Sequence, residues 1–279
     1  MTDLNPQGRQ MADESMVRTL AAQASAIWPQ EKALFARYGL PADARILDAG
    51  CGTGEIAARL AALLPGASVL GVDIIDAHLD LARTRHAAFG ARLAFEHRSI
   101  FELGLPDAGF DLVVCRHVLH SIPHAARVLA ELVRVTRPGG WLHLIVEDYG
   151  MLHFERHGLD LREFWHVVPA AFGAATGTDM FVGRHAYGLL TALGLQEIAV
   201  DHVVVDTLRV PRETFASILE AWRDGFSAAI GELTPVPAEA ARACFDQAIA
   251  DVRDERRYAA WFVPVASARV PPGPSLTAA

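Results

Sequence analysis

Short apolar runs alternate with helical patterns along most of this chain. The apolar runs are typical of buried strands, and they begin near residues 46, 69, 93, 110 and 141. The helical pattern from Glu55 to Leu64 follows the first run and is rich in alanine and leucine, which favour helices. Strands that alternate with helices build a sheet with helices on both faces. The pattern therefore predicts an α/β fold with a doubly wound, mostly parallel sheet.

Two segments with other patterns are expected to surround this core. Residues 1–40 predict an N-terminal helical cap, because they carry one or two amphipathic helical patterns that include Trp28. Residues 150–184 form an insertion rich in histidine and aromatic side chains, within a core that is expected to span 41–206. Binding residues gather on segments that a rigid sheet positions, so we expect these segments to take part in substrate choice.

A long helical insertion separates the last two predicted strands. A sixth strand ends near Val205 and the last strand covers 259–270, whereas a simple hairpin would join them in about two to five residues. The insertion at 207–258 carries helical patterns at 212–230 and 238–254 with apolar side chains that must be buried. We expect it to form a lid over the substrate site. A helical pair that thickens the core, or that forms a homodimer interface, is the alternative.

The most specific motif of the chain follows the first strand. Residues 46–54 read ILDAGCGTG, so that the strand runs into Asp48 and then into glycines at alternate positions, Gly50, Gly52 and Gly54. Glycine lets the backbone turn sharply, and the missing Cβ lets a ligand lie against main-chain amides at the start of the next helix. The third glycine arrives one residue earlier than in the dinucleotide fingerprint G-x-G-x-x-G.

This D-x-G-C-G-x-G pattern resembles motif I of class I S-adenosylmethionine-dependent methyltransferases. Three later landmarks follow in the family's order: a strand ending in Asp73, a strand from Phe110 to Cys115 that looks like motif IV, and Arg-Pro-Gly-Gly at 137–140. The resemblance covers residues 46–146. It implies a seven-stranded Rossmann-like sheet, S-adenosyl-L-methionine as cofactor, and methyl transfer to a small, partly apolar metabolite.

The resemblance also indicates which residues contact the cofactor. Asp73 follows the second strand, where Rossmann-like sheets place a carboxylate on the ribose hydroxyls. Ser99 departs from the family, which most often has an aspartate there for the adenine amine, although one hydroxyl bond remains available and Ile100 can cover the ring. The full set of expected cofactor contacts is Asp48, Gly50, Cys51, Gly52, Gly54, Asp73, Ile74, Ser99, Ile100, Cys115 and Arg116.

Catalysis by such a protein depends mainly on alignment. The sulfonium methyl is already electrophilic, so the protein must hold it in line with the nucleophile at roughly 3 Å and exclude water. A general base is needed only when the acceptor carries a proton on the attacking atom. Ligands bind beyond the carboxyl ends of the strands in open α/β sheets, which favours His117, Glu147 and Tyr149 as catalytic residues. The candidate substrate contacts are Trp28, His153 and His166.

The twelve histidines also raise a metal hypothesis, which their spacing does not support. His117, His120 and His124 have helical spacing, but the Ser-Ile-Pro run within this segment predicts the start of a new helix. His153 and His157 share a face only if residues 152–158 are helical, and a third ligand is missing. No metal is therefore expected.

Composition and charge narrow the range of partners. No stretch approaches 18 apolar residues and the first thirty residues lack a signal-peptide core, so we expect a cytoplasmic protein with no membrane partner. The net charge is −8, and Lys32 is the single lysine beside 24 arginines without any basic run, which argues against nucleic acid. The three cysteines form neither a disulfide framework nor a metal-ligand pair. Residues 271–279 predict an unstructured tail.

Two alternative functions remain open from the sequence. A nicotinamide-dependent oxidoreductase would share the sheet, but the glycine spacing opposes it, and a Tyr-x-x-x-Lys motif is excluded because Lys32 is the only lysine. A non-catalytic binding protein would keep the fold as a scaffold. A comparison of the equilibrium binding of S-adenosylmethionine and of NAD would distinguish the methyltransferase from the oxidoreductase. Methyl transfer to any acceptor would exclude the non-catalytic binding protein.

Overall fold

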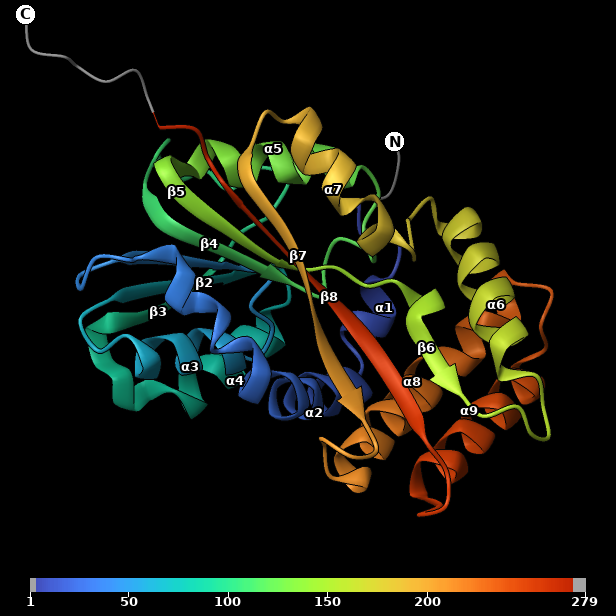
Figure 1. Ribbon diagram of the computed structural model, residues 1–279. Coiled ribbons are helices and arrows are strands. Elements are labelled where there is room, and N and C mark those ends of the chain that lie inside the picture. The colour runs from blue at the N-terminus through green and yellow to red at the C-terminus, as the bar shows by residue number, and fades with distance from the viewer. Residues whose placement is uncertain (1–3, 273–279) are drawn as a thin grey trace, which may run out of the picture.

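One eight-stranded sheet lies at the centre of the structure (Figure 1), a computed structural model that describes residues 4–272. Its strands are β1 (Arg45–Ala49), β2 (Ser68–Asp73), β3 (Leu93–His97), β4 (Phe110–Arg116), β5 (Thr136–Ile145), β6 (Leu152–Phe154), β7 (Gln196–Asp206) and β8 (Ala259–Arg269). The strands β3, β2, β1, β4 and β5 pair in parallel in that order, and β8 runs antiparallel to β5, β6 and β7. The predicted doubly wound, mostly parallel sheet is confirmed.

The eighth strand in this sheet is the short β6. Residues 265–269 of β8 pair with β5, and residues 259–261 pair with β6, while β7 occupies the other edge of β8. The sequence predicted seven strands because a three-residue strand is too short to show a period. The condition for a shared histidine face is not met, since residues 152–154 form the strand β6, which pairs with β8, and residues 155–158 are not helical. His153 and His157 therefore do not share a helical face.

Helices cover both faces of the sheet and the far end of β7 and β8 (Figure 1). Those on or beside the sheet are α1 (Gly8–Met11), α2 (Glu14–Glu31), η1 (Leu34–Tyr38), α3 (Glu55–Leu63), α4 (Asp76–Arg85), η2 (Ala87–Arg92), α5 (Ala125–Val135) and α7 (Val182–Ala192). Those at the far end are η3 (Tyr149–Met151), α6 (Leu161–Thr176), α8 (Arg212–Leu233) and α9 (Ala238–Arg253). Within residues 4–272, none of these helices combines the length and the apolar character needed to cross a membrane.

Neighbouring residues of the central strands pack against opposite helix layers. In β4, Leu112 and Val114 belong to the core formed with α3, whereas Val113 and Cys115 belong to the core formed with α5 and α7. Successive side chains of a strand point to opposite faces, so a strand that is buried on both faces reads as one continuous apolar run. This explains why the sequence around residues 112–115 carries no polar alternation.

The insertion before the last strand forms part of the core. Its helices α8 and α9 match the predicted patterns, and α8 packs on α9, α2 and α6. Phe215, Ile218 and Leu219 of α8 are completely buried. The middle of α8 reaches the cavity described below through Trp222 and Phe226. The lid role of this insertion remains a prediction, and of the predicted tail only residues 271 and 272 are described, without regular structure.

Candidate active site at the carboxyl ends of the strands

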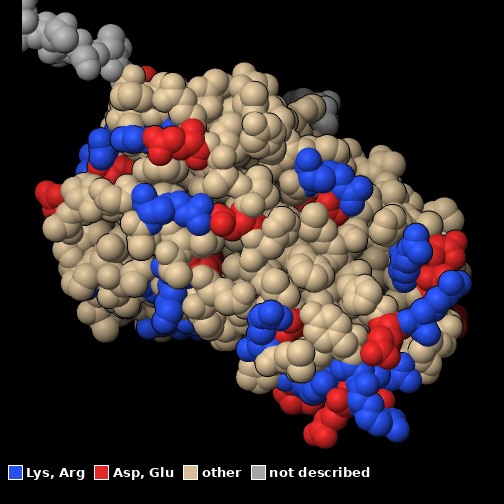
Figure 2. Space-filling view, in the orientation of Figure 1, with Lys and Arg blue, Asp and Glu red and all other residues tan. Residues whose placement is uncertain are grey.

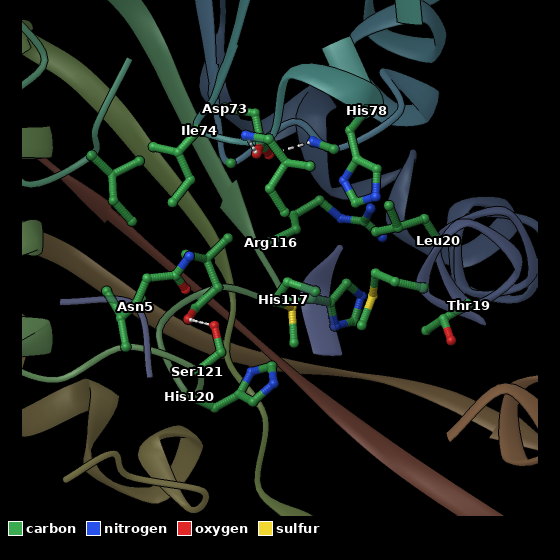
Figure 3. Close-up of a pocket in the computed structure, with 18 of the residues that line it drawn as sticks. Asn5, Thr19, Leu20, Asp73, Ile74, His78, Arg116, His117, His120 and Ser121 are labelled. Carbon is green, nitrogen blue, oxygen red and sulfur yellow. Dashed lines mark hydrogen bonds between the residues drawn. The ribbon is translucent and has the colours of Figure 1, made fainter. Parts of the chain in front are cut away.

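A cavity lies where the parallel strands β1 to β5 end (Figure 3). Its empty volume is about 1050 Å³, the open mouth included. The loops after all five strands contribute to its wall, together with α2, the segment before α2, and α8. This is the position at which open α/β sheets bind their ligands, because the loops that follow parallel strands gather at one edge.

The glycine turn after β1 forms one wall of the cavity. Gly50, Gly52 and Gly54 have φ angles of 78°, 50° and 77°, a region that side chains rarely adopt. The amide of Gly50 donates to the Val72 carbonyl at 2.8 Å, which ties the turn to β2. A Cβ atom on Gly52 would lie 2.6 Å from Cδ1 of Leu20 in α2. The positive φ angles and the neighbouring side chains therefore both favour glycine in this turn.

Asp73 lies at the end of β2, on the cavity wall (Figure 3). Its Oδ2 accepts the amide proton of Gly52 at 2.8 Å, and its Oδ1 accepts that of Ile75 at 3.0 Å. A carboxylate has about four acceptor positions, so roughly two remain for a ligand. The predicted contacts Ile74, Ser99 and Ile100 lie on the same cavity wall.

Two buried groups of opposite charge lie behind the glycine turn. Asp48 and Arg116 are 2% and 8% exposed, and both line a side pocket next to Cys51. Asp48 Oδ2 and Arg116 Nη2 have no hydrogen-bond partner within residues 4–272. Burial raises the pKa of the Asp48 carboxyl to about 7, although the nearby Arg116 works to lower it. Unpaired buried polar groups are costly, so this arrangement indicates a ligand that carries both a cation and an anion.

Helix α2 holds Arg116 in place. The guanidinium Nε of Arg116 lies 2.8 Å from Oε1 of Glu31, a residue at the end of α2 with no exposed surface. His143 Nε2 donates to the same carboxylate oxygen at 2.9 Å, and the Tyr38 hydroxyl donates to His143 Nδ1 at 2.6 Å. Burial works to raise the pKa of Glu31, but Arg116 and His143 outweigh it, and the pKa lies below its usual range. Glu31 was not predicted as a functional residue, because a glutamate in an amphipathic helix normally faces solvent.

The ends of β4 and β5 bring one carboxylate and two imidazoles together. His117 Nδ1 donates to Oε1 of Glu147, and His120 Nδ1 lies 2.8 Å from Oε2 of the same residue. All three line the cavity, and Glu147 is almost completely buried. His117 Nε2 is buried and finds no partner in the described part of the chain. Burial lowers the pKa of His117 even against the opposing effect of Glu147, which favours a neutral imidazole.

His120 was missed as a functional residue because the Ser-Ile-Pro run after it predicted a new helix, so the histidines of this segment were not expected to share one face. In the structure both histidines lie in the loop after β4, and His117 has a φ of 57°. The left-handed conformation turns the chain so that both imidazoles reach Glu147. Only the contact with a residue 30 positions later could have revealed the pair.

Tyr149 stands beside this cluster, two residues after Glu147. Its hydroxyl lies 3.5 Å from His120 Nε2, and its ring packs against Trp165 and Trp222. Burial raises the pKa of Tyr149 well above its usual range, so that its hydroxyl is neutral at physiological pH. Tyr149 is thus suited to hydrogen bonding rather than to proton abstraction.

Three predicted substrate contacts lie outside the cavity lining. Trp28 packs on Phe35 with ring centroids 5.7 Å apart, as an aromatic side chain of a core helix commonly does. His153 is exposed in β6, and His166 is exposed on α6. Both histidines face solvent, so their role in substrate binding stays a prediction that the cavity lining does not support. Among residues 4–272, no group of His, Cys, Asp and Glu side chains is arranged to hold a metal ion.

Two predicted cofactor contacts also lie away from the cavity. Cys115 is completely buried in the core between β4 and the helices α5 and α7, since its position in the strand points it away from the cavity. Gly54 forms the N-cap of α3, and a Cβ atom there would lie 2.6 Å from the ring of Phe95. Gly54 therefore shapes the turn, while Gly50 and Gly52 line the cavity.

Comparison with known sequences agrees with the residues at the site. A family model described as a methyltransferase domain matches residues 46–140. The chain is 37% identical to demethylmenaquinone methyltransferase of Deinococcus radiodurans over 101 residues, which are 36% of this chain and 42% of that relative. The chain spans about two-fifths of the length of the curated relatives it matches.

Comparison with solved structures extends over most of the chain. Phosphoethanolamine N-methyltransferase 2 of Haemonchus contortus, in complex with S-adenosyl-L-methionine, is similar with a TM-score of 0.58 and 18% identity, over 95% of this chain and 60% of that chain. The [4+2]-cyclase SpnF is similar with a TM-score of 0.52 and 22% identity, over 83% of this chain and 76% of that chain. At such identities the likeness shows the fold. Residues 46–140 therefore match the methyltransferase domain family, and the chain has the fold of class I methyltransferases.

Proposed function

We propose that this protein is an S-adenosylmethionine-dependent methyltransferase that acts on a small, partly apolar metabolite. The observation that carries the proposal is the meeting of three different sets of groups around one cavity. These are the positive-φ glycine turn with Asp73, the unpartnered atoms Asp48 Oδ2 and Arg116 Nη2 at the adjoining side pocket, and the contact of His117 with Glu147. Each set suits a different part of the reaction.

The first two sets fit the cofactor. S-adenosylmethionine carries an ammonium and a carboxylate at one end, and an adenosine at the other. The free Nη2 of Arg116 suits the carboxylate, and the free Oδ2 of Asp48 suits the ammonium. Asp73 keeps acceptor capacity for the ribose hydroxyls. Ile74, Ser99 and Ile100 lie on the cavity wall where the adenine would bind.

The third set can remove a proton from the methyl acceptor. The bound cofactor supplies an electrophilic methyl group. His117 Nε2 takes the proton of an attacking hydroxyl, while Glu147 holds the Nδ1 proton and stabilises the positive charge that forms on the ring. His120 and Tyr149 complete a polar edge for the acceptor. The buried wall of α8, with Trp222 and Phe226, excludes water from this edge.

The remaining partner predictions belong to the same proposal. A small-molecule acceptor agrees with the size of the cavity, whose empty volume is about 1050 Å³ with its open mouth included. On the face seen in Figure 2, arginines lie beside acids rather than in a separate basic area, and Arg253 contacts Glu213 and Glu220. A phosphate backbone would need a row of free cations, so we do not expect nucleic acid as a partner. A cytoplasmic location and a homodimer through the helical insertion remain proposals.

A second candidate function rests on the likeness to the cyclase SpnF. One fold can support different reactions, so an enzyme that binds its substrate here without transferring a methyl group is the alternative. The test is an incubation of the protein with methyl-labelled S-adenosylmethionine and metabolite extracts, followed by mass spectrometry. We expect a labelled product that is absent with the His117→Asn variant. Conversion of a metabolite without incorporation of label would favour the alternative.

A further inference from the structure

A second cavity adjoins the first one, between α6 and α8. Its empty volume is about 440 Å³. Seven of its eleven lining residues are aromatic and none is charged, and they include Phe164, Trp165 and Val168 of α6 and Ile230 of α8. Burial of an unpaired ion in such a wall is strongly unfavourable. The cavity is therefore suited to a neutral, apolar group.

The two cavities share a wall beside His120, a member of the cluster that contains the proposed base. Tyr149, Trp222 and Phe226 line both of them. The hydroxyl of Tyr149 lies 3.5 Å from His120 Nε2, so the shared wall borders the cluster around Glu147. A molecule that fills the second cavity can thus extend past these rings toward the first.

Ring packing holds the second cavity in shape. Trp165 packs edge to face on Trp222 and on Phe245, with ring centroids 6.0 Å and 5.5 Å apart. Phe164 also packs edge to face on Phe245, at 5.5 Å. Such contacts stabilise a fixed arrangement of rings, and ligand sites are usually formed before the ligand binds.

One polar atom in this apolar wall lacks a partner. The indole Nε1 of Trp165 is buried and makes no hydrogen bond to any of residues 4–272, and the side chain is only 4% exposed. A buried N–H group without an acceptor destabilises a protein, so most such groups are paired. A ligand oxygen in the cavity would supply the missing acceptor.

We propose that the second cavity binds the apolar body of the methyl acceptor, a neutral aryl or alkyl group that carries a hydrogen-bond-accepting oxygen for Trp165. The nucleophilic hydroxyl of the same molecule then reaches His117 in the first cavity. This inference rests on the proposed function, which it deepens by naming the substrate class.

The test uses a series of 4-alkylphenols with increasing chain length as probes. Their affinity is measured by calorimetry on the whole protein, with and without saturating S-adenosylhomocysteine. We expect about a fourfold gain in affinity for each added methylene until the cavity is full. Val168→Phe should remove this dependence on chain length, because the new ring fills the cavity, whereas the affinity for S-adenosylhomocysteine should stay unchanged.

Val167→Phe is the matched control, because Val167 directly precedes Val168 on α6 but is 43% exposed and does not line the cavity. It should bind the phenols like the wild type. Ile230→Phe fills the cavity from the opposite wall and replaces Val168→Phe if that variant fails to fold. Trp165→Phe should lower the affinity for 4-alkoxyphenols, which carry an extra ether oxygen, more than the affinity for 4-alkylphenols of equal length.

Two outcomes separate this inference from the proposed function. The inference would be overturned if binding of S-adenosylhomocysteine remains but the affinity for the phenols is independent of chain length. It would also be overturned if Val168→Phe and Ile230→Phe bind long phenols like the wild type. Absence of S-adenosylhomocysteine binding in the wild type would overturn the proposed function instead. In that case the phenol series without cofactor still shows whether the cavity accepts apolar groups.

Discussion

His117 and Glu147 contact each other directly just beyond the ends of the paired strands β4 and β5, although they are 30 residues apart in the sequence. The carboxylate of Glu147 accepts the Nδ1 proton, which fixes the tautomer of His117 and leaves Nε2 with a free lone pair. The cavity wall therefore presents a base that is oriented before an acceptor arrives.

Removal of this base should affect turnover far more than cofactor binding. With a hydroxyl acceptor, we expect His117→Asn to lower kcat by about 10²- to 10⁴-fold, the usual contribution of a general base. Affinity for S-adenosylmethionine should change little. Single-turnover kinetics and calorimetry measure the two effects separately. A kcat close to that of the wild type would assign the proton transfer to another group, with His120 as the first candidate.

The burial of His117 should make both rate and stability depend on pH. Burial lowers its pKa in the folded protein below the value of about 6.5 that it has when unfolded. The unfolded state therefore binds more protons as the pH falls below about 6.5, and the folded state loses stability there. As the pH is lowered, the catalytic rate should stay constant until the pH falls below this lowered pKa of His117, and it should decrease below that point.

Thermal unfolding at a series of pH values checks this prediction. The His117→Asn variant is the control, because it lacks the imidazole that titrates. Its stability should fall less steeply than that of the wild type below about pH 6.5. Identical pH dependence in the two proteins would show that His117 is not buried as a neutral ring.

Asp48 should couple cofactor binding to a proton. Its pKa in the free protein is raised to about 7 by burial, against the lowering effect of Arg116. A ligand ammonium favours the ionised carboxylate, so binding should release a proton near neutral pH, and affinity should rise between about pH 6 and pH 8. Calorimetry in buffers with different ionisation enthalpies measures this release. Asp48→Asn should bind more weakly and release no proton, and equal proton release from both proteins would contradict the assignment.

Asp73 should contribute strongly to cofactor affinity. We expect Asp73→Ala to weaken S-adenosylmethionine binding by about 1.5 to 3 kcal/mol, the range for hydrogen bonds to a charged group. Asp73 also accepts the amide protons of Gly52 and Ile75, so Asp73→Asn is the control that keeps one acceptor oxygen. Unchanged affinity in the alanine variant, measured by calorimetry, would remove Asp73 from the cofactor site.

The role of the helical insertion is best tested by point substitutions. Deletion of residues 207–258 would remove α8 and α9 and expose the surfaces of α2 and α6 on which they pack, so loss of activity after deletion would be uninformative. We expect Phe226→Ala to raise the acceptor KM several-fold and to spare cofactor affinity, because Phe226 lines both cavities. Leu208→Ala, at an exposed position of the same insertion, is the control. An unchanged KM for Phe226→Ala would favour a purely structural insertion.

The sequence was sufficient to predict features that depend on neighbouring residues. The glycine turn follows its strand directly and Asp73 ends the next strand, and the structure places Gly50, Gly52 and Asp73 on the cavity wall. The alternation of strands and helices was also readable, because buried parallel strands form uninterrupted apolar runs. These features need no knowledge of distant contacts.

Long-range contacts could not be predicted in the same way. Glu31 contacts Arg116 and His143, and the latter is 112 residues away along the chain. The second cavity exists only because α6 and α8 pack together. Trp28 was predicted to contact the substrate, but an aromatic residue in an amphipathic helix can face either a ligand or the core. Only its packing on Phe35 in the structure distinguishes the two.

The most direct test of the account is an equilibrium titration of the purified protein with S-adenosylmethionine and, separately, with NAD. The groups around the glycine turn predict saturable binding of one S-adenosylmethionine per chain, with an affinity that falls at least tenfold in Asp73→Ala, and no binding of NAD. Tighter binding of NAD than of S-adenosylmethionine, or no S-adenosylmethionine binding at all, would contradict the central claim.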